Sequence, residues 1–305
     1  MTVPSREYHV LQIDAFTTHK FEGNAASVVL DAQGLRDDEM QRIAREMNNS
    51  ETAFILPPDG DDHDLNVRYF TPSVEVPFCG HATIAAHYAR AILGRLGSHA
   101  VRQKSRAGPI EIDVREIDGD YHVSMLQRPP EFQAPLSDHI ASATMAAVSG
   151  SVADLRSDCP VQVVSTGHSK VLVGLRSRAA VLGLTPISAA LVALNCDIGS
   201  NGFHFFALEA VEPGVLTTCR MFGPAIGILE DPVTGNGNGP LGAYLVRHRL
   251  IDFPHDGTFS FRSAQGHAVS RPGIADVTVY IGRGEPVRTR VGGAAVLVFS
   301  TTIRL

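Results

Sequence analysis

Hydrophobic and polar positions along the first half of the chain predict many short strands and two helices. Apolar residues spaced i, i+3, i+4 and i+7 predict a helix over residues 37–47, ended by Asn48, which tolerates a left-handed backbone. A second helix is predicted after residue 80, with Ile84 and Tyr88 on its buried face. Alternating or short apolar runs predict strands over residues 8–16, 26–30, 52–56, 65–70, 110–115 and 121–126.

The second half of the chain repeats this order of elements. A helix is expected there with Thr185 as its N-cap and Pro186 in its first turn. No short solenoid period explains the repeat, so we predict an internal duplication of a unit of roughly 150 residues. The strands predicted in this half cover residues 161–165, 170–175, 203–208 and 219–224.

The expected fold class is α+β, with two pseudo-symmetric domains that each wrap a mixed sheet around a central helix. Strands outnumber helices and the turns between strands are short, which disfavours a doubly wound parallel sheet. We place the first domain at residues 1–128, completed by a C-terminal strand over 290–305, and the second at residues 129–289. The proline-rich residues 128–135 are the predicted linker. A binding site is expected where the two domains meet.

Two segments join a strand end to a helix start through a glycine turn. They are residues 76–88 and residues 230–244. The first turn of a helix leaves backbone N–H groups unpaired, so each turn is suited to bind an anion. The turns read Cys79-Gly80-His81-Ala82 and Asp231-Pro-Val-Thr234-Gly235-Asn236.

Composition narrows the function classes. The 305 residues carry a formal net charge of −6, which offers no basic face for nucleic acid. No run of about 18 apolar residues is present to span a membrane, and the first residues lack the apolar core of a secretion signal, so a cytoplasmic protein is expected. The four cysteines are dispersed, which favours reduced thiols over disulfides or a structural zinc.

Four side chains are candidates for chemistry, and each has a structural alternative. Glu51 lies among apolar residues where a helix meets a strand and is the candidate proton carrier; otherwise it is a surface glutamate. His81 and Cys79 sit at a predicted helix start, as proton-transfer groups or as packed structural residues. Asp231 is placed to hold a substrate amine or hydroxyl, or else belongs to a helix cap.

Motifs of other enzyme classes are missing from the sequence. The glycines after Thr234 do not form a dinucleotide-binding fingerprint, since no Gly-x-Gly-x-x-Gly follows a strand with an acidic partner about 20 residues on. The sequence also contains no Ser-His-Asp elbow and no lysine-containing phosphate loop. Cys79 and His81 lack two further metal ligands at a recognisable spacing, so no metal is expected.

Together these motifs resemble the PhzF-like phenazine biosynthesis family over nearly the whole chain. The resemblance implies a diaminopimelate epimerase-like fold, homodimers and an isomerase that works without a cofactor. It matches Glu51 to the family's general acid/base, His81 and Asp231 to groups that assist proton movement, and Gly235 to a site glycine. The motifs are Ile13-Asp-Ala-Phe16, Gly23-Asn24, Ala44-Arg-Glu-Met-Asn48, Ser50-Glu51-Thr52, Phe70-Thr71-Pro72, Gly80-His81, Met221-Phe222, Pro224 and Glu230-Asp231-x-x-Thr234-Gly235.

Two positions depart from the phenazine enzyme, which isomerises trans-2,3-dihydro-3-hydroxyanthranilate. Asn236 stands where that enzyme has a serine, and Cys79 replaces a small residue. Cys79 resembles the first cysteine of diaminopimelate epimerase, but the mirrored turn offers Thr234 in place of a second cysteine. A two-cysteine epimerase is therefore disfavoured, and the chain looks nearer to the family's uncharacterised bacterial isomerase branch.

The leading hypothesis is a cofactor-independent isomerase that moves a proton on a small carboxylate-bearing metabolite. Glu51, His81 and Asp231 are its predicted catalytic residues, and a small-molecule substrate, without nucleic acid or membrane, is its expected partner. The alternatives are a racemase or epimerase that uses Cys79, and a metabolite-binding protein without turnover. The predicted substrate-binding residues are Cys79, Gly80, Ala82, Gly235 and Asn236.

Overall fold

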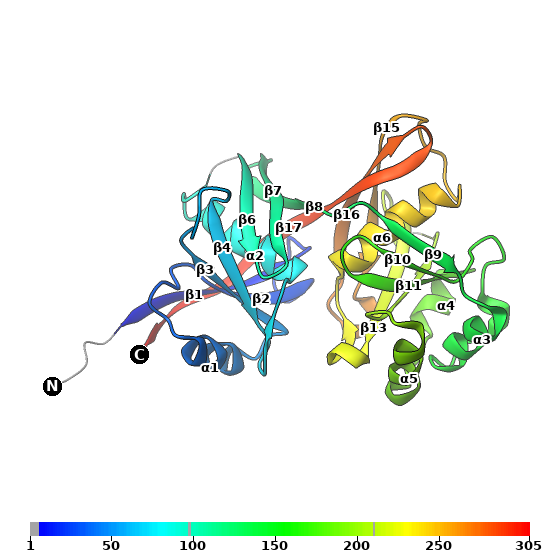
Figure 1. The fold of residues 1–305 in the computed structure, drawn as a ribbon, viewed down its shortest axis with the longest axis horizontal. Helices are drawn as coiled ribbons and strands as arrows, with labels where there is room; N and C mark the ends of the chain where they lie inside the picture. The colour runs from blue at the N-terminus through cyan, green and yellow to red at the C-terminus, as the bar shows by residue number, and fades with distance from the viewer. Residues whose placement is uncertain (1–5, 97–98, 210) are drawn as a thin grey trace. The chain divides into compact units, whose positions relative to one another are not determined.

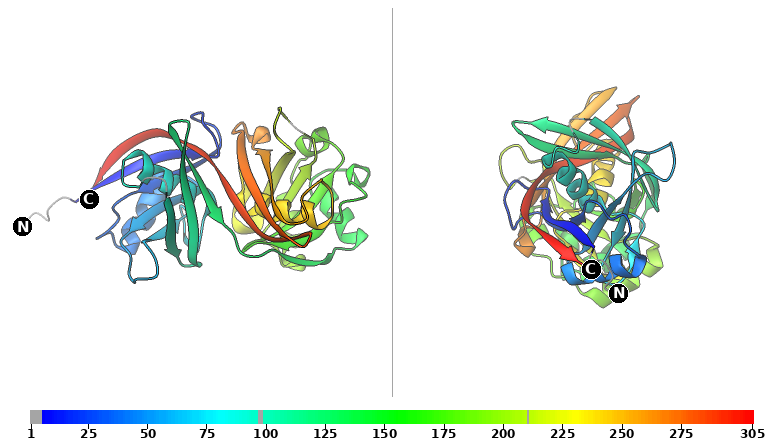
Figure 2. Two further views of the ribbon diagram at one scale, coloured as in Figure 1. Left: turned by 90° about the horizontal axis from the view of Figure 1, so that it is seen from above. Right: turned by 90° about the vertical axis from the view of Figure 1, so that its left-hand side faces the viewer.

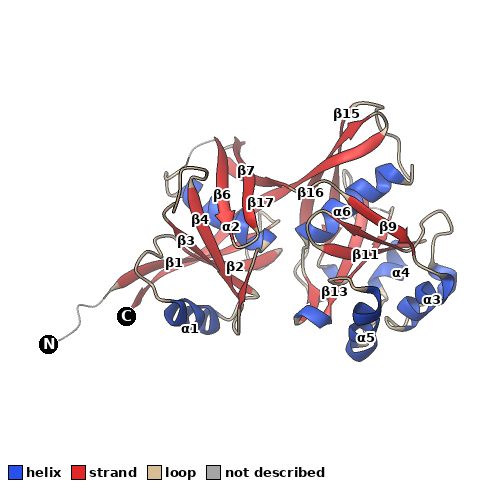
Figure 3. Cartoon of the chain, in the orientation of Figure 1, coloured by secondary structure: helices blue, strands red, loops and turns tan. Residues whose placement is uncertain are grey.

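The chain forms two compact units in a computed structural model that describes residues 6–96, 99–209 and 211–305 (Figure 1). The first unit is Met1–Met125 with Gly292–Leu305, and the second is Leu126–Val291. Both mix strands with a few helices (Figure 3). In the described residues, no helix has the length and apolar character needed to cross a membrane.

The first unit is a mixed sheet in which antiparallel and parallel pairs alternate. Strands β1 and β2 pair antiparallel, β2 and β3 parallel, β3 and β4 antiparallel, β4 and β6 parallel, and β6 and β7 antiparallel. The end of β17 pairs antiparallel with β1, so the first and last strands of the chain lie side by side (Figure 2). The elements are β1 (Glu7–Ala15), β2 (Asn24–Val29), α1 (Asp37–Met47), β3 (Glu51–Leu56), β4 (Leu65–Phe70), β5 (Glu75–Val76), α2 (Gly80–Ile92), β6 (His99–Ser105), β7 (Gly108–Ile117), β8 (Asp120–Leu126) and the part of β17 (Glu285–Arg304) that follows Val291.

Helix α2 is the centre of the first unit and packs against β1, β2 and β3 (Figure 1). Its alanines let the strands approach closely, and Ala82, Ala85 and Ala86 are fully buried. Helix α1 is different, because only its Met40, Ile43 and Ala44 face is buried. As predicted, α1 ends at Asn48, which has a left-handed backbone. A small-residue helix inside a sheet thus carries the first glycine turn at its start.

The second unit repeats the topology of the first. Strands β10 and β11 pair antiparallel, β11 and β12 parallel, β12 and β13 antiparallel, β13 and β15 parallel, and β15 and β16 antiparallel. The elements are β9 (Glu131–Pro135), α3 (Asp138–Ala146), β10 (Gln162–Ser165), β11 (Ser169–Leu175), α4 (Arg178–Leu182), α5 (Ser188–Ile198), β12 (Phe203–Ala207), β13 (Thr217–Gly223), β14 (Ile228–Asp231), α6 (Gly235–Arg247), β15 (Gly257–Gln265) and β16 (Gly273–Gly282), with short 3-10 turns at Val152–Asp154, Pro224–Ile226 and His267–Val269. This matched order confirms the predicted α+β fold with two pseudo-symmetric halves.

An arginine–glutamate pair recurs at the same place in both units. Arg68 of β4 binds Glu75 through two hydrogen bonds of 2.8 Å. Arg220 of β13 binds Glu230 in the same two-pronged way, at 2.8 and 2.7 Å. Each pair fixes the short strand that leads toward the central helix, since such bidentate contacts constrain both position and orientation. The duplication therefore includes the arginine–glutamate pair that supports each glycine turn.

Two local predictions are wrong. Residues 131–135 are not a linker, because they form β9 and pair antiparallel with β10. Helix α5 begins at Ser188 with Ile187 as its N-cap, so Thr185 does not cap it. The amide groups of Thr185 and Ile187 instead donate to backbone carbonyls at the end of the α3 segment, both at 2.8 Å, which keeps the chain extended there.

Candidate functional site

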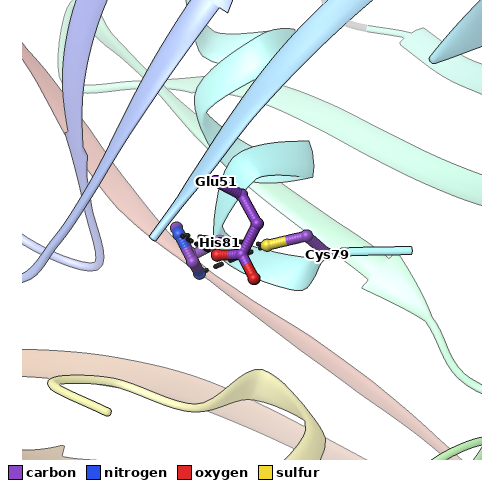
Figure 4. A group of neighbouring side chains, drawn as sticks. All are labelled: Glu51, Cys79 and His81. Atoms are coloured by element: carbon purple, nitrogen blue, oxygen red, sulfur yellow. Dashed lines mark hydrogen bonds and ion pairs between the residues drawn. The ribbon is translucent and has the colours of Figure 1, made fainter. Parts of the chain in front are cut away.

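Glu51, Cys79 and His81 converge in the first unit (Figure 4). Glu51 is the first residue of β3, where its backbone pairs with Ala26 of the parallel neighbour β2. Cys79 is the N-cap of α2 with an extended backbone, and His81 lies in the first turn of that helix. All three side chains are buried, with residue exposures of 6–7%. Strand β3 and the start of α2 thus bring together a carboxylate, a thiol and an imidazole.

The imidazole of His81 stands between the other groups. Its Nε2 atom is 3.4 Å from Glu51 Oε2 and 3.1 Å from Ser50 Oγ. Its Nδ1 atom is 3.4 Å from Cys79 Sγ. Glu51 Oε2 is buried and makes no hydrogen bond within the described part of the chain. A buried carboxylate oxygen without a donor is a costly arrangement unless a ligand or a proton satisfies it.

The start of α2 adds backbone donors to this cluster. No side chain caps the helix, and the amides of Gly80, His81 and Ala82 have no acceptor among the described residues. The first turn of a helix carries partial positive charge, so these N–H groups favour an anion. The expected role of Gly80 and Ala82 in binding a carboxylate stays a prediction.

A chain of buried hydrogen bonds holds the Cys79 turn in place. Thr83 Oγ1 donates to the Cys79 carbonyl at 2.6 Å, so Tyr69 must donate to Thr83, at 2.5 Å. Gln103 donates to the Tyr69 hydroxyl at 2.7 Å and accepts from His87 Nε2 at 2.9 Å. Burial lowers the pKa of His87 to about 4, which keeps its ring neutral. His87 therefore supports the Cys79 turn through Gln103, Tyr69 and Thr83.

The same three side chains are a potential metal site. The ligand atoms of Glu51, Cys79 and His81 all lie within 4.8 Å of one another. Thiolate, imidazole and carboxylate are ligands that Zn²⁺ accepts. Proton transfer and metal binding would use the same atoms here. A metal ion bound by these three side chains would therefore prevent Glu51 from accepting a proton.

Asp231 belongs to a separate cluster in the second unit, at the start of α6. Thr234 is the N-cap, and its hydroxyl donates to Asp231 Oδ2 at 2.5 Å. Gln265 donates to the Asp231 carbonyl at 2.7 Å and accepts from the Thr234 amide at 3.2 Å. No acceptor is present for the amides of Gly235 and Asn236 within the described residues. The predicted second anion-binding turn thus has free donors, and its role in binding stays a prediction.

Two buried basic side chains of the second unit are not singled out by any sequence pattern. Lys170 of β11 is 3% exposed, and burial lowers its pKa to about 8. His204 of β12 is fully buried, its two ring nitrogens make no hydrogen bond with the described residues, and burial lowers its pKa to about 3. The only sequence signal is a polar residue inside an apolar strand, which does not distinguish a functional side chain from a structural one.

The family follows from comparison with known proteins. The family model described as phenazine biosynthesis-like protein matches residues 13–301. The chain belongs to this family. It is 46% identical to an uncharacterized isomerase of Clostridium acetobutylicum over 98% of this chain and 99% of that protein. It is 31% identical to the trans-2,3-dihydro-3-hydroxyanthranilate isomerase of Pseudomonas chlororaphis, over 98% of this chain and all of that protein.

A solved structure of the phenazine biosynthesis-like family agrees with the fold. The PhzF family protein of Bacillus anthracis superimposes with a TM-score of 0.87 at 30% identity, covering 98% of this chain and 99% of that one. The Clostridium and Pseudomonas relatives are isomerases by name, and the chain is an isomerase of the same family. The predicted family and enzyme class are therefore confirmed.

Proposed function

We propose that this isomerase moves a proton between two carbons of a small carboxylate-bearing metabolite, without a cofactor, with Glu51 as the proton carrier. The substrate resembles trans-2,3-dihydro-3-hydroxyanthranilate, on which a relative acts by name. Glu51 takes the proton as a C–H bond breaks, and the electron pair of that bond shifts the neighbouring double bond. The same proton then returns to a second carbon, so that the composition of the molecule is unchanged.

The observation that carries this proposal is the buried Oε2 atom of Glu51, which makes no hydrogen bond with the described residues. Other buried acids of this chain, such as Glu39 and Glu230, are held by arginines. Glu51 has only the ring of His81, at 3.4 Å, and no hydrogen bond to that oxygen from the described residues. A carboxylate left open in this way can accept and return a proton, whereas an arginine-paired carboxylate is held in its charged form.

The remaining groups of the cluster have supporting roles in the proposal. His81 orients Glu51 and, through Nε2, can relay its proton. The free amides of Gly80 and Ala82 receive the negative charge that develops on the substrate. Asp231 is proposed to hold a substrate amine or hydroxyl. A homodimer, which the family resemblance implied, stays a prediction.

Deuterium incorporation tests the role of Glu51. The protein is incubated in heavy water with trans-2,3-dihydro-3-hydroxyanthranilate and with a panel of small cyclic amino acids, and deuterium in each is followed by mass spectrometry. For a substrate found with wild type, Glu51→Gln is expected to slow incorporation by about 10²-fold to 10⁴-fold, as removal of a general base does.

A matched variant separates this effect from a general loss of fold. Glu46→Gln makes the same chemical change, from a carboxylate to an amide, at an exposed position of α1. It is expected to leave deuterium incorporation unchanged. If Glu51→Gln incorporates deuterium as fast as wild type and unfolds at the same temperature, Glu51 is rejected as the proton carrier.

A second candidate function is a racemase or epimerase that uses Cys79 as a base. The observation in its favour is the 3.4 Å distance from Cys79 Sγ to His81 Nδ1, since a neighbouring imidazole promotes the reactive thiolate. This alternative is supported if Cys79→Ser stops deuterium incorporation and Glu51→Gln does not. The reverse pattern supports Glu51.

A further inference from the structure

The second unit holds a buried lysine that the proposed proton transfer does not use. The ammonium group of Lys170 has one hydrogen bond, to the carbonyl of the adjacent Ser169 at 3.3 Å. No carboxylate forms an ion pair with it among the described residues. The other two lysines differ: Lys20 is exposed, and Lys104 binds Asp59 at 2.8 Å. An ammonium group without a directly contacting carboxylate is costly to bury, so a charged ligand would stabilise it.

The register of the sheet places Lys170 on the face that carries Asp231. His204 of β12 pairs with Met221, and Met221 pairs with Asp231, so these side chains form one row. Leu172 pairs with His204, and Lys170 lies two residues before it in β11, on the same face. Asp231 also interacts electrostatically with Lys170. The side chains of Lys170 and Asp231 therefore belong to one polar region on this face of the sheet.

The first turn of α6 lies against this row. A Cβ atom added at Gly237 would stand 2.5 Å from His204 Nδ1, so this glycine lets the helix start rest on the imidazole. The amides of Gly235 and Asn236 in that turn are without acceptors among the described residues. His204 is fully buried beside Asn238 of this helix, and neither of its ring nitrogens makes a hydrogen bond of ordinary geometry with the described residues.

We propose that Lys170 and the amides that begin α6 form an anion-binding subsite for a carboxylate, with Asp231 beside it for an amine or hydroxyl of the same molecule. A ligand of this class is a small amino acid or hydroxy acid. A carboxylate gives Lys170 a direct ion pair, which Asp231 does not form with it among the described residues, and satisfies the free N–H groups. The identity of this ligand as the substrate rests on the proposed function; the binding of the anion does not.

Nuclear magnetic resonance of the lysine side chains tests the proposal directly. The chain contains three lysines, so protein labelled with ¹³C-lysine gives three Cε signals, assigned with Lys20→Met and Lys104→Met. The probe is anthranilate, a stable carboxylate, and the matched compound is aniline, which lacks the carboxylate. Anthranilate is expected to shift the Lys170 signal and raise the pKa of Lys170, whereas aniline leaves both unchanged.

Binding to variants gives the second measurement. By calorimetry, Lys170→Met is expected to weaken anthranilate binding at least about tenfold, as loss of a charged hydrogen-bond partner does, and Lys104→Met to leave it unchanged. Lys170→Arg, which keeps the charge, is expected to retain part of the affinity. Binding should also weaken as the pH rises above the pKa of Lys170; the groups coupled to it are Asp231, His204 and His168.

Each result separates this proposal from the proposed function. A Lys170 signal that neither anthranilate nor acetate shifts at the highest soluble concentration overturns the subsite, as does equal affinity in Lys170→Met. Neither outcome bears on deuterium incorporation by Glu51. Conversely, incorporation that survives Glu51→Gln overturns the proposed function and leaves the anion-binding result standing.

Discussion

Replacing Lys170 by Met is expected to stabilise the unliganded protein at neutral pH, although it removes a proposed ligand-binding group. Burial lowers the pKa of Lys170 from 10.5 to about 8, and this lowering corresponds to about 3 kcal/mol of folding free energy. Met has a similar length and no charge, so it fills the space without the desolvation cost. This pKa already includes the favourable interaction with Asp231, so about 3 kcal/mol is the whole electrostatic gain expected of the substitution.

The sign of the pH dependence follows from the direction of the shift. Below pH 8 the ammonium group is charged in the folded and unfolded protein, and the folded state carries the full cost. Between pH 8 and 10.5 the folded protein has released the proton while the unfolded chain still holds it, so the stability of wild type rises with pH. The advantage of Lys170→Met should therefore shrink by about 2 kcal/mol between about pH 7 and about pH 9.5.

Urea unfolding of both proteins across this pH range is the assay. Tyrosines and cysteines that titrate in the same range cancel in the difference between variant and wild type. Lys20→Met, at an exposed position, is the control and should change stability by no more than about 0.5 kcal/mol at any pH. A Lys170→Met protein that is less stable than wild type, with a difference independent of pH, refutes the reasoning that an unpaired charge is buried here.

Three further predictions concern the scaffold of the two glycine turns. Gly239→Ala should destabilise the protein by about 1–3 kcal/mol in urea unfolding, because the added Cβ meets the Gln127 side chain, although alanine otherwise favours a helix by about 1 kcal/mol. Glu230→Gln should cost about 3–5 kcal/mol by the same measurement, because it leaves the buried Arg220 without its charge partner. Neutral His87 contributes stability that is complete above pH 6.5 and is lost, by about 3 kcal/mol, as the pH falls to 4, so unfolding of His87→Gln should depend less on pH there.

The controls for these three predictions lie at open positions. Gly282→Ala places a Cβ in ordinary contact, with its nearest neighbour at 3.4 Å, and should change stability little. Glu46→Gln removes an exposed carboxylate and should cost no more than about 0.5 kcal/mol. Equal losses in Gly239→Ala and Gly282→Ala would contradict the contact with Gln127. An unchanged pH dependence in His87→Gln would show that acid unfolding is governed by other groups.

The sequence predicted elements well where one physical signal dominates. Helix α1 shows a strong apolar period, acidic residues in its first turn and Asn48 at its end, and the structure has all three. Helix α3 was missed although Ser137 caps it and Asp138 follows, because its short alanine-rich stripe is weak. The prolines around strand β9 favour a linker at this position, yet proline is tolerated at strand ends.

The site was predictable in part because two of its residues are close in sequence. Cys79 and His81 share one turn, but only the family resemblance indicated that Glu51 would join them, since β3 and α2 meet through the packing of the sheet. Lys170 and His204 carry no such signal. A lysine at the start of a strand reads as a surface residue, and its burial depends on strand pairing that no local pattern encodes.

The two glycine turns show which features the duplication keeps and which it exchanges. In both central helices, the fourth residue after the N-cap donates a side-chain hydrogen bond to the N-cap carbonyl: Thr83 to Cys79 at 2.6 Å, and Asn238 to Thr234 at 3.0 Å. In both, a buried glutamine from the strand that pairs parallel with β4 or β13 supports the turn. These glutamines are Gln103 and Gln265.

What differs is the chemistry placed on this common support. The first turn places the imidazole of His81 beside the carboxylate of Glu51, whereas the second carries the carboxylate of Asp231, which interacts electrostatically with the buried ammonium group of Lys170. A proton carrier must be free to change its charge, but a substrate anchor works best with a fixed one. The repeated backbone thus explains why both turns have free amides, and the exchanged side chains explain why only one is expected to move a proton.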